Sequence, residues 1–355
     1  MQNESSVKIP ATVVTGFLGA GKTTLIRNLL NSANGRKIAL IINEFGDMGV
    51  DGDLLKGCGV ETCTEEDVVE LTNGCICCTV ADDFIPTMQK LIERDRKVDH
   101  IVIETSGLAL PQPLVNAFNW PEIRERVTVD GVVTVVDSAA VAEGRFAHDE
   151  NALAEQRAGD DALDHESPLE ELFEDQLGCA DMIILNKSDL VDDSELSRVE
   201  TEVGNQVTRP VKLVRASNGN LPVEVLLGLE SATETEIANR KSHHELHHED
   251  GHHHHHDHDD FESFVVDIGS INRAPAFIEN LKKLIEDHGV LRLKGFADVT
   301  GKPMRLLIQA VGNRVDHYFD REWSNDEHRK TQLVVIGLAG LDREAITKQI
   351  QAAIV

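Results

Sequence analysis

Two hydrophobic patterns alternate along the first two thirds of the chain. Short, apolar, β-branched runs predict strands, and segments with apolar residues at helical spacing lie between them. The predicted strands are Ala11–Thr15, Lys37–Asn43, His100–Thr105, Gly131–Asp137, Met182–Asn186 and Val211–Ala216. The predicted helices include Lys22–Asn31, Asp82–Arg94, Glu170–Leu177 and Ser194–Val203. Continuous apolar strands joined by helices are typical of an α/β domain whose largely parallel sheet is covered on both faces.

The pattern changes after residue 260, where strands outnumber helices. Strands are predicted at Phe261–Ile268, Val290–Asp298, Met304–Val311 and Gln332–Leu338, and helices at Pro275–His288 and Asp342–Ala353. This order predicts a smaller α+β domain, for which a ferredoxin-like arrangement is the candidate. We expect three regions: an α/β domain at 1–230, a flexible linker at 231–260 and the α+β domain at 261–355.

Charge is concentrated in two segments. The formal net charge is −28, but residues 143–175 hold twelve acidic and two basic residues, and residues 234–262 hold nine and two. Residues 243–258 also contain ten of the sixteen histidines and almost no apolar residues. Such a segment cannot bury enough apolar surface to order itself, which is why we expect a flexible linker there.

Composition narrows the classes of partner and compartment. The acidic excess argues against nucleic acid and anionic membranes as partners, and only 4% of residues are aromatic, too few to favour base stacking. No apolar run approaches the roughly 18 residues of a membrane span, and residues 1–6 do not resemble a secretory signal. Three of the six cysteines lie within residues 75–78, too crowded for a disulfide framework. We expect a reduced, cytoplasmic protein.

A glycine-rich loop follows the first predicted strand. Residues 16–23 read GFLGAGKT and lead into a helix, which is the strand–loop–helix setting of the phosphate-binding P-loop. Backbone N–H groups of such a loop point at phosphate oxygens, while Lys22 reaches the outer phosphates and Thr23 offers a hydroxyl to Mg²⁺. The loop predicts a nucleotide site.

Three segments after the loop indicate guanine and a nucleotide-dependent switch. Glu104 ends a strand where its carboxylate could hold Mg²⁺ through water, and Gly107 gives the following backbone freedom to move. Asn186–Asp189 reads NKSD, and the Asp189 carboxylate can accept from the two N–H donors on one edge of guanine. Residues 215–217 are expected to brace the other side of the base. We expect Lys22, Thr23 and Glu104 to act in catalysis, and the nucleotide to contact Gly16, Phe17, Leu18, Gly19, Ala20, Gly21, Lys22, Thr23, Thr24, Gly107, Asn186, Lys187, Asp189 and Ser217.

A cluster of thiols precedes the helix at 82–94. Cys75, Cys77 and Cys78 could bring two or three sulfurs onto one metal if the chain turns into the helix, and an incomplete ligand set suits a metal that must later leave. Buried core cysteines and a redox pair are the alternatives. Cys58 and Cys63 could add a ligand, and we assign Cys179 to the core.

The histidine-rich run offers a second kind of metal site. His252, His253, His254, His255, His256 and His258, interleaved with carboxylates, suit divalent Co²⁺, Ni²⁺ or Zn²⁺ bound loosely. A merely solvated spacer is the alternative.

These motifs together resemble the CobW-type metallochaperone GTPases. The resemblance rests on GFLGAGKT at 16–23, NEFG at 43–46, LTNGCICC at 71–78, ETSG at 104–107 and NKSD at 186–189, and on the C-terminal segments Leu293–Asp298, Arg321–Trp323 and Leu333–Gly337. It covers nearly the whole chain outside the linker and the acidic segment. Residues 54–63, 80–89, 144–148 and 164–167 are most similar to the members of cobalamin biosynthesis.

The resemblance implies a mechanism and partners. It implies a GTPase whose cysteines bind metal with Mg²⁺-GTP and release it after hydrolysis, delivering Co²⁺ to the cobaltochelatase of aerobic cobalamin synthesis, while other members handle zinc. Some relatives carry an acidic residue where this chain has Ile42, and that auxiliary carboxylate is absent here. Asp47 is a further candidate ligand, with Thr23 and Glu104, for Mg²⁺. No water-positioning Gln or arginine finger is evident in the sequence, so we expect slow intrinsic turnover.

Three alternatives remain open at this point. A zinc chaperone for another client metalloprotein would use the same residues, because thiolates bind Zn²⁺ more tightly than Co²⁺. A nucleotide-dependent enzyme with a cysteine nucleophile would not require metal. A histidine-rich metal-storage protein would depend on residues 243–258.

Overall fold

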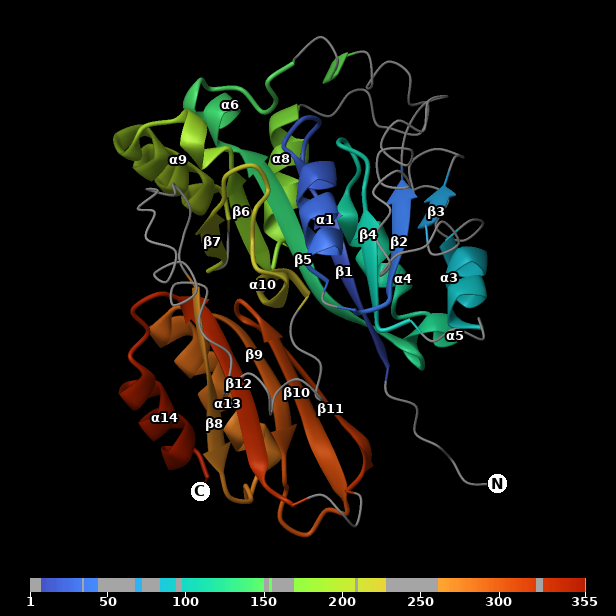
Figure 1. Cartoon of the computed structure of the whole chain (residues 1–355), viewed down its shortest axis with the longest axis vertical. Coiled ribbons are helices and arrows are strands. Elements are labelled where there is room, and N and C mark those ends of the chain that lie inside the picture. Colours follow the sequence, from blue (N-terminus) through green and yellow to red (C-terminus); the bar gives the residue numbers. More distant parts are fainter. Residues whose placement is uncertain are drawn as a thin grey trace. The chain divides into compact units, whose positions relative to one another are not determined.

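The computed structural model describes residues 8–33, 35–43, 68–71, 84–93, 98–149, 153–154, 169–207, 210–227, 261–323 and 328–354. The chain divides into two compact units, one of which is Lys8–Leu226 and the other of which takes in Leu227–Val355. Within the described ranges, the first unit contains a parallel sheet with helices, and the second contains an antiparallel sheet (Figure 1).

Parallel strands form the sheet of the first unit, in the order β3-β2-β4-β1-β5-β6-β7 among the described residues (Figure 1). The strands are β1 (Ile9–Thr15), β2 (Ile38–Asn43), β3 (Val68–Leu71), β4 (His100–Glu104), β5 (Val127–Asp137), β6 (Met182–Asn186) and β7 (Lys212–Arg215). Because the strands are parallel, their carboxyl ends meet at one edge of the sheet. The strand β1 lies between β4 and β5, so the loop that follows it sits centrally at that edge.

Helices cover both faces of this sheet. They are α1 (Lys22–Asn31), α3 (Ile85–Ile92), α4 (Pro111–Ala117), α5 (Pro121–Arg124), α6 (Ser138–Ala142), α8 (Leu169–Cys179), α9 (Asp193–Gln206) and α10 (Val223–Leu227), with a 3₁₀ turn, η3, at Ser188–Leu190. Figure 1 shows α1 and α10 in front of the sheet and α4 and α8 behind it. The three layers confirm the α/β class predicted from the sequence.

The apolar stripes of these helices explain the packing. Helix α1 buries Leu25, Ile26, Leu29 and Leu30, which recur at helical spacing. Helix α8 buries Leu172, Phe173 and Leu177 against β5 and β6. Cys179, which we assigned to the core, is half-buried and packs against the cluster beneath α3 and α4.

The second unit has an antiparallel sheet in the order β11-β10-β9-β12-β8 within the described residues. Its elements are β8 (Phe261–Ile268), α13 (Ala274–His288), β9 (Val290–Ala297), β10 (Met304–Val311), β11 (Arg314–Glu322), β12 (Thr331–Leu338) and α14 (Arg343–Ala352). Both helices pack their apolar residues against the sheet. The α+β class is confirmed, and β12 lies between β8 and β9 as in the split β-α-β unit of ferredoxin-like folds, with β10 and β11 added beside β9.

The sequence predicted most of these elements and missed a few. The bounds of α1, β6, β8 and β10 agree with the prediction to the residue. The prediction omitted β3, β11, α4, α5, α6 and α10. The edge strand β11 reads RVDHYFDRE, and its charged residues concealed the strand because an edge strand needs no continuous apolar run.

Candidate functional site

Two glycines allow the loop after β1 to adopt its shape. Gly16 has φ 137°, and a Cβ there would lie 2.1 Å from the carbonyl oxygen of Val135 on β5. Gly21 has φ 102°, and a Cβ there would lie 2.3 Å from the side-chain nitrogen of Asn186. Both positions therefore demand glycine, for backbone conformation and for space. Gly21 directly precedes α1, so the positive N-terminal end of that helix faces the loop.

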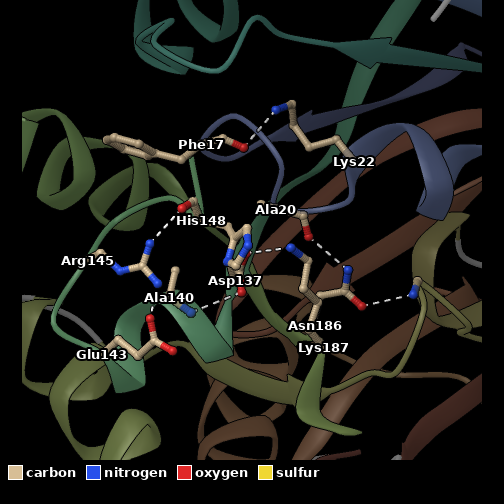
Figure 2. Close-up of polar contacts among 11 residues, drawn as sticks. Phe17, Ala20, Lys22, Asp137, Ala140, Glu143, Arg145, His148, Asn186 and Lys187 are labelled. Carbon is tan, nitrogen blue, oxygen red and sulfur yellow. Dashed lines mark hydrogen bonds and ion pairs between the residues drawn. The ribbon is translucent and has the colours of Figure 1, made fainter. Parts of the chain in front are cut away.

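Lys22 spans the loop from the first turn of α1. Its ammonium donates to the carbonyl oxygens of Gly16, at 2.7 Å, and Phe17, at 3.1 Å, as Figure 2 shows for Phe17. The residue is only 7% exposed. A buried ammonium is thus held beside a glycine loop, where its positive charge and the N–H groups of the loop can bind a phosphate group.

The other residues of the loop differ in burial and in their contacts. Phe17 is buried, with its ring 5.8 Å from that of Phe146 and 5.6 Å from that of Phe173. The backbone N–H of Ala20 donates to the Phe17 carbonyl at 3.2 Å. Leu18 is half-buried, while Gly19 and Thr24 are exposed. The aromatic contacts fix the loop to residues near the two ends of the acidic segment 143–175.

Thr23 meets Glu104 at the carboxyl ends of β1 and β4. The Thr23 hydroxyl donates to Glu104 Oε1 at 3.0 Å, although 81 positions separate the residues. Glu104 is 4% exposed. The pairing β1·β4 brings them together, so the structure unites a hydroxyl and a carboxylate that the sequence only suggested were near each other.

The loop after β4 is fixed by a residue that the sequence analysis missed. The side-chain amide of Gln176, on α8, donates to the carbonyl oxygens of Gly107 and Ala109, each at 3.1 Å. Gln176 is completely buried. It occupies a polar position on the apolar stripe of α8, between Phe173 and Leu177, and that interruption was a signal that could have found it.

Asn186 joins the P-loop to the loop after β7. Its amide nitrogen donates to the Ala20 carbonyl at 2.8 Å, and its amide oxygen accepts from the backbone N–H of Gly219 at 2.9 Å (Figure 2). Ala20 lies 166 positions earlier in the chain. Asn186 thus ties together two of the segments predicted to contact nucleotide.

The remaining residues of the predicted base site lie around η3. Lys187 has a left-handed backbone, with φ 59°, and its ammonium pairs with Asp137 at 2.5 Å (Figure 2). Ser188 contacts the Ser217 hydroxyl at 3.0 Å, so the two loops meet here, and Asp189 is exposed.

Arg215 does not brace this site with its side chain. Its guanidinium instead forms two hydrogen bonds with the Glu200 carboxylate on α9, at 2.6 and 2.9 Å. This ion pair directs the Arg215 guanidinium from β7 toward α9. This part of the expectation for residues 215–217 was wrong.

The predicted thiol and histidine sites lie outside the described residues, as do Asp47, Cys58 and Cys63. This applies to Cys75, Cys77 and Cys78, and to the histidines at 252–256 and 258. Among the residues that the structure does describe, no group of three or more His, Cys, Asp or Glu side chains is arranged to hold a metal. In the same part of the chain, no helix has the length and apolar character needed to cross a membrane.

Family comparisons cover both units. Residues 10–215 match the CobW/HypB/UreG nucleotide-binding domain, and residues 243–354 match the cobalamin synthesis protein cobW C-terminal domain. Among solved structures, the Zn(II)-bound YjiA GTPase of Escherichia coli aligns over 98% of this chain and 99% of its own, with 23% identity and a TM-score of 0.39.

Curated relatives match along nearly the full length. A zinc chaperone CobW of Sinorhizobium is 65% identical over 98% of both chains. A zinc chaperone CobW of Pseudomonas aeruginosa is 54% identical over 98% of this chain and 92% of its own. The zinc chaperone YjiA of Escherichia coli is 30% identical over 93% of this chain and 94% of its own. With its P-loop geometry and these matches, the chain belongs to the CobW/HypB/UreG family of P-loop GTPases.

Proposed function

We propose that this GTPase is a metallochaperone that carries a divalent metal, zinc, on Cys75, Cys77 and Cys78 and passes it to a client metalloprotein. The observation that carries the nucleotide half of the proposal is the meeting of Thr23 and Glu104 beside the Lys22 loop, at 3.0 Å. The metal half rests on the thiol motif and on the relatives named zinc chaperones.

Lys22 and the N-terminal end of α1 supply the positive charge for phosphates. In the proposed complex, the Lys22 ammonium turns from the Gly16 and Phe17 carbonyls to the outer phosphates, exchanging two neutral acceptors for charged ones. The phosphate oxygens then accept hydrogen bonds from backbone N–H groups at the start of the helix. Removing this ammonium would therefore weaken the binding of every nucleoside di- and triphosphate.

Thr23 and Glu104 fit a magnesium ion. A hydroxyl and a carboxylate are hard oxygen ligands of the kind that Mg²⁺ prefers, and their existing contact shows that both side chains reach one point. When bound, Mg²⁺ would neutralise charge on the phosphates. Thr23 and Glu104 keep those oxygens at the carboxyl edge of the sheet, next to the phosphate loop.

Guanine selection is assigned to Asp189. Its carboxylate can accept from both N–H donors on one edge of guanine, which adenine does not offer. Asn186 supports this assignment because it binds both Ala20 in the phosphate loop and Gly219 in the loop beyond β7, and so fixes the distance between the two ends of the nucleotide site.

Zinc is favoured over the Co²⁺ that we expected from the sequence. Thiolates bind Zn²⁺ more tightly than Co²⁺ in the usual divalent order, and the relatives are named for zinc. Those names give no support to cobaltochelatase as the recipient, so we propose a client metalloprotein without naming it.

Metal binding and nucleotide binding should strengthen each other. If the thiols bind metal best when Mg²⁺-GTP is present, linkage requires that the metal raise the affinity for GTP by the same factor. Hydrolysis then weakens the metal site close to the client.

Visible absorption of Co²⁺, used as a probe for the zinc site, tests this coupling. We expect intense thiolate bands with Mg²⁺-GTP and weak ones with Mg²⁺-GDP, and competition with buffered Zn²⁺ should abolish them. The variant Cys77→Ala should lose the bands. Retention of tight binding in Cys77→Ala, or equal bands with GTP and GDP, would overturn the proposal.

The deletion of residues 243–258 separates transport from storage. We expect the shortened chain to keep one tight, GTP-dependent zinc site and to lose only weaker ions. Loss of all metal binding would instead support storage by the histidine-rich run.

A further inference from the structure

Asp137 ends the strand β5 at the same edge as the nucleotide site. Its partner in the register of β5 and β6 is Asn186, so the two residues end neighbouring parallel strands side by side. The Asp137 side chain is 1% exposed. A buried carboxylate is costly unless it is paired and hydrogen-bonded, so its partners show what it stabilises.

Each oxygen of this carboxylate has a different partner. Oδ1 accepts the backbone N–H of Ala140 at 3.1 Å and caps the N-terminus of α6. Oδ2 accepts the ammonium of Lys187 at 2.5 Å (Figure 2). The cap alone would be served by a serine or asparagine, as at many helix N-termini. The negative charge is needed for Lys187.

Lys187 is held in a conformation that lysine rarely adopts. Its φ of 59° and ψ of 31° lie in the left-handed region, which is unfavourable for a residue with a Cβ. Asn186 fixes the backbone before it through Ala20 and Gly219, and Ser188 fixes the backbone after it through the Ala216 carbonyl. Asp137 fixes the side chain.

This conformation determines where the base-recognition carboxylate lies. Lys187 starts the turn η3, and Asp189 is the next residue but one, in that turn. A free lysine side chain loses rotamer entropy when it is ordered. The ion pair orders it in advance, with the side chain still 26% exposed and so available to a ligand.

We propose that Asp137 is a specificity-determining positioning residue, which holds Lys187 and thereby sets the Asn186–Asp189 segment for a guanine nucleotide. This inference rests on the proposed guanine site and adds a residue to it. Asp137 acts through Lys187 and does not itself touch the base.

Two variants separate the charge from the helix cap. Asp137→Asn and Asp137→Ser both keep an acceptor for the α6 cap, but neither offers a carboxylate to Lys187. We expect each to weaken GDP binding about tenfold, and to weaken inosine diphosphate, which lacks the 2-amino group of guanine, by less. The ratio of the two dissociation constants should therefore shrink, which a purely structural role would not cause.

A double-mutant cycle with Lys187→Met tests the route of action. In the Lys187→Met background, Asp137→Asn should have no further effect on GDP affinity, because the ion pair is already broken. As a matched control, Glu200→Gln removes the carboxylate of the neighbouring Arg215 pair and should leave GDP affinity unchanged.

The outcomes distinguish this inference from the proposed function. The role of Asp137 is overturned if Asp137→Asn keeps the GDP affinity and guanine preference of the parent. It is also overturned if Asp137→Asn weakens GDP binding as much in the Lys187→Met background as in the parent. Neither outcome contradicts the proposed guanine site. A parent chain that binds ADP as well as GDP overturns the proposed guanine site and this inference with it.

Discussion

The two units bury charged side chains in different places and for different reasons. In the first unit, Lys22, Glu104 and Asp137 are buried at the carboxyl edge of the parallel sheet. Lys22 bonds to the loop that precedes it, and Glu104 and Asp137 bond to segments distant in the chain. In the second unit, Arg305 and Asp320 lie on adjacent strands within the sheet. Arg305 donates to Asp320 at 2.7 Å and stacks 3.5 Å above the Phe296 ring.

Under the proposed function, this difference separates charges that stabilise the fold from charges that serve the nucleotide site. The Arg305–Asp320 pair satisfies itself on two neighbouring strands, so its removal should affect folding only. The charges of the first unit converge on one edge, where a phosphate or a base can replace a protein partner. Four predictions test this contrast, beginning with the largest effect.

Breaking the buried pair should destabilise the second unit strongly. Asp320→Asn removes the carboxylate that pairs with the buried Arg305 guanidinium, and we expect the free energy of unfolding to fall by about 3–5 kcal/mol. The chain has two tryptophans, Trp120 in the first unit and Trp323 in the second. Urea unfolding followed by Trp323 fluorescence in a Trp120→Phe background reports on the second unit. Nucleotide affinity should not change.

The exposed pair of Arg314 and Asp316 is the control for that variant. Their side chains are 26% and 44% exposed, so Asp316→Asn should cost less than about 1 kcal/mol. Equal effects of the two variants would show that burial does not set the cost.

Removing the Lys22 ammonium should weaken nucleotide binding, which Asp320→Asn should leave unchanged. We expect Lys22→Ala to weaken GDP and GTP binding about a hundredfold, because in the proposed complex the ammonium donates charge-assisted hydrogen bonds to phosphate. Titration with fluorescent nucleotides measures the loss. The exposed Lys90 on α3 is the control, and Lys90→Ala should bind like the parent. Unaltered affinity in Lys22→Ala would contradict the assignment of the loop to phosphate.

Gln176 should affect hydrolysis more than binding. Gln176→Met keeps the volume but leaves the Gly107 and Ala109 carbonyls without their donor, which releases the backbone that follows Glu104. We expect kcat for GTP to fall about tenfold with KM nearly unchanged, as a positioning effect on catalysis would require. Gln176→Leu also lacks the amide donor and should behave alike. Parent activity in Gln176→Met and Gln176→Leu would show that donation is not the relevant property.

The smallest effect concerns the cap of α9. The backbone N–H of Glu195 and the Ser194 hydroxyl lower the pKa of Asp192 below its usual 3.8. Because the folded pKa is the lower one, the carboxylate stabilises the fold above pH 3.8, and this contribution is lost as the pH falls through the folded value.

Urea unfolding at several pH values measures the contribution of this cap. We expect the stability difference between the parent and Asp192→Ala to be constant near neutrality and to narrow in acid. Asp192→Asn also caps but does not titrate, so its difference from Asp192→Ala should not depend on pH. The lowered pKa of Asp192 would be contradicted if the stability difference between the parent and Asp192→Ala also stayed constant as the pH falls into the acid range.

Local signals predicted the nucleotide loop well and its supporting residues poorly. Helix Lys22–Asn31 was predicted to the residue because a glycine loop, a lysine and an apolar stripe follow one another directly. Asp137 was placed at a strand end but given no role, although it ends an apolar strand just as Asn186 does. We assigned Arg215 to the base from its position near the end of a predicted strand. That position does not indicate that its side chain pairs with Glu200.

The sequence by itself determined the classes of the two sheets and the glycine loop of a nucleotide site, because strand and helix patterns and loop motifs are local. Only the tertiary structure decided which of these residues meet. Thr23 reaches Glu104 across 81 positions, and Lys187 reaches Asp137 across 50. Strand order and register decide such contacts, and these depend on how the whole sheet packs. Composition marked residues 143–175 only as acidic, and it could not show that Phe173 and Gln176 of helix α8 contact the loops after β1 and β4.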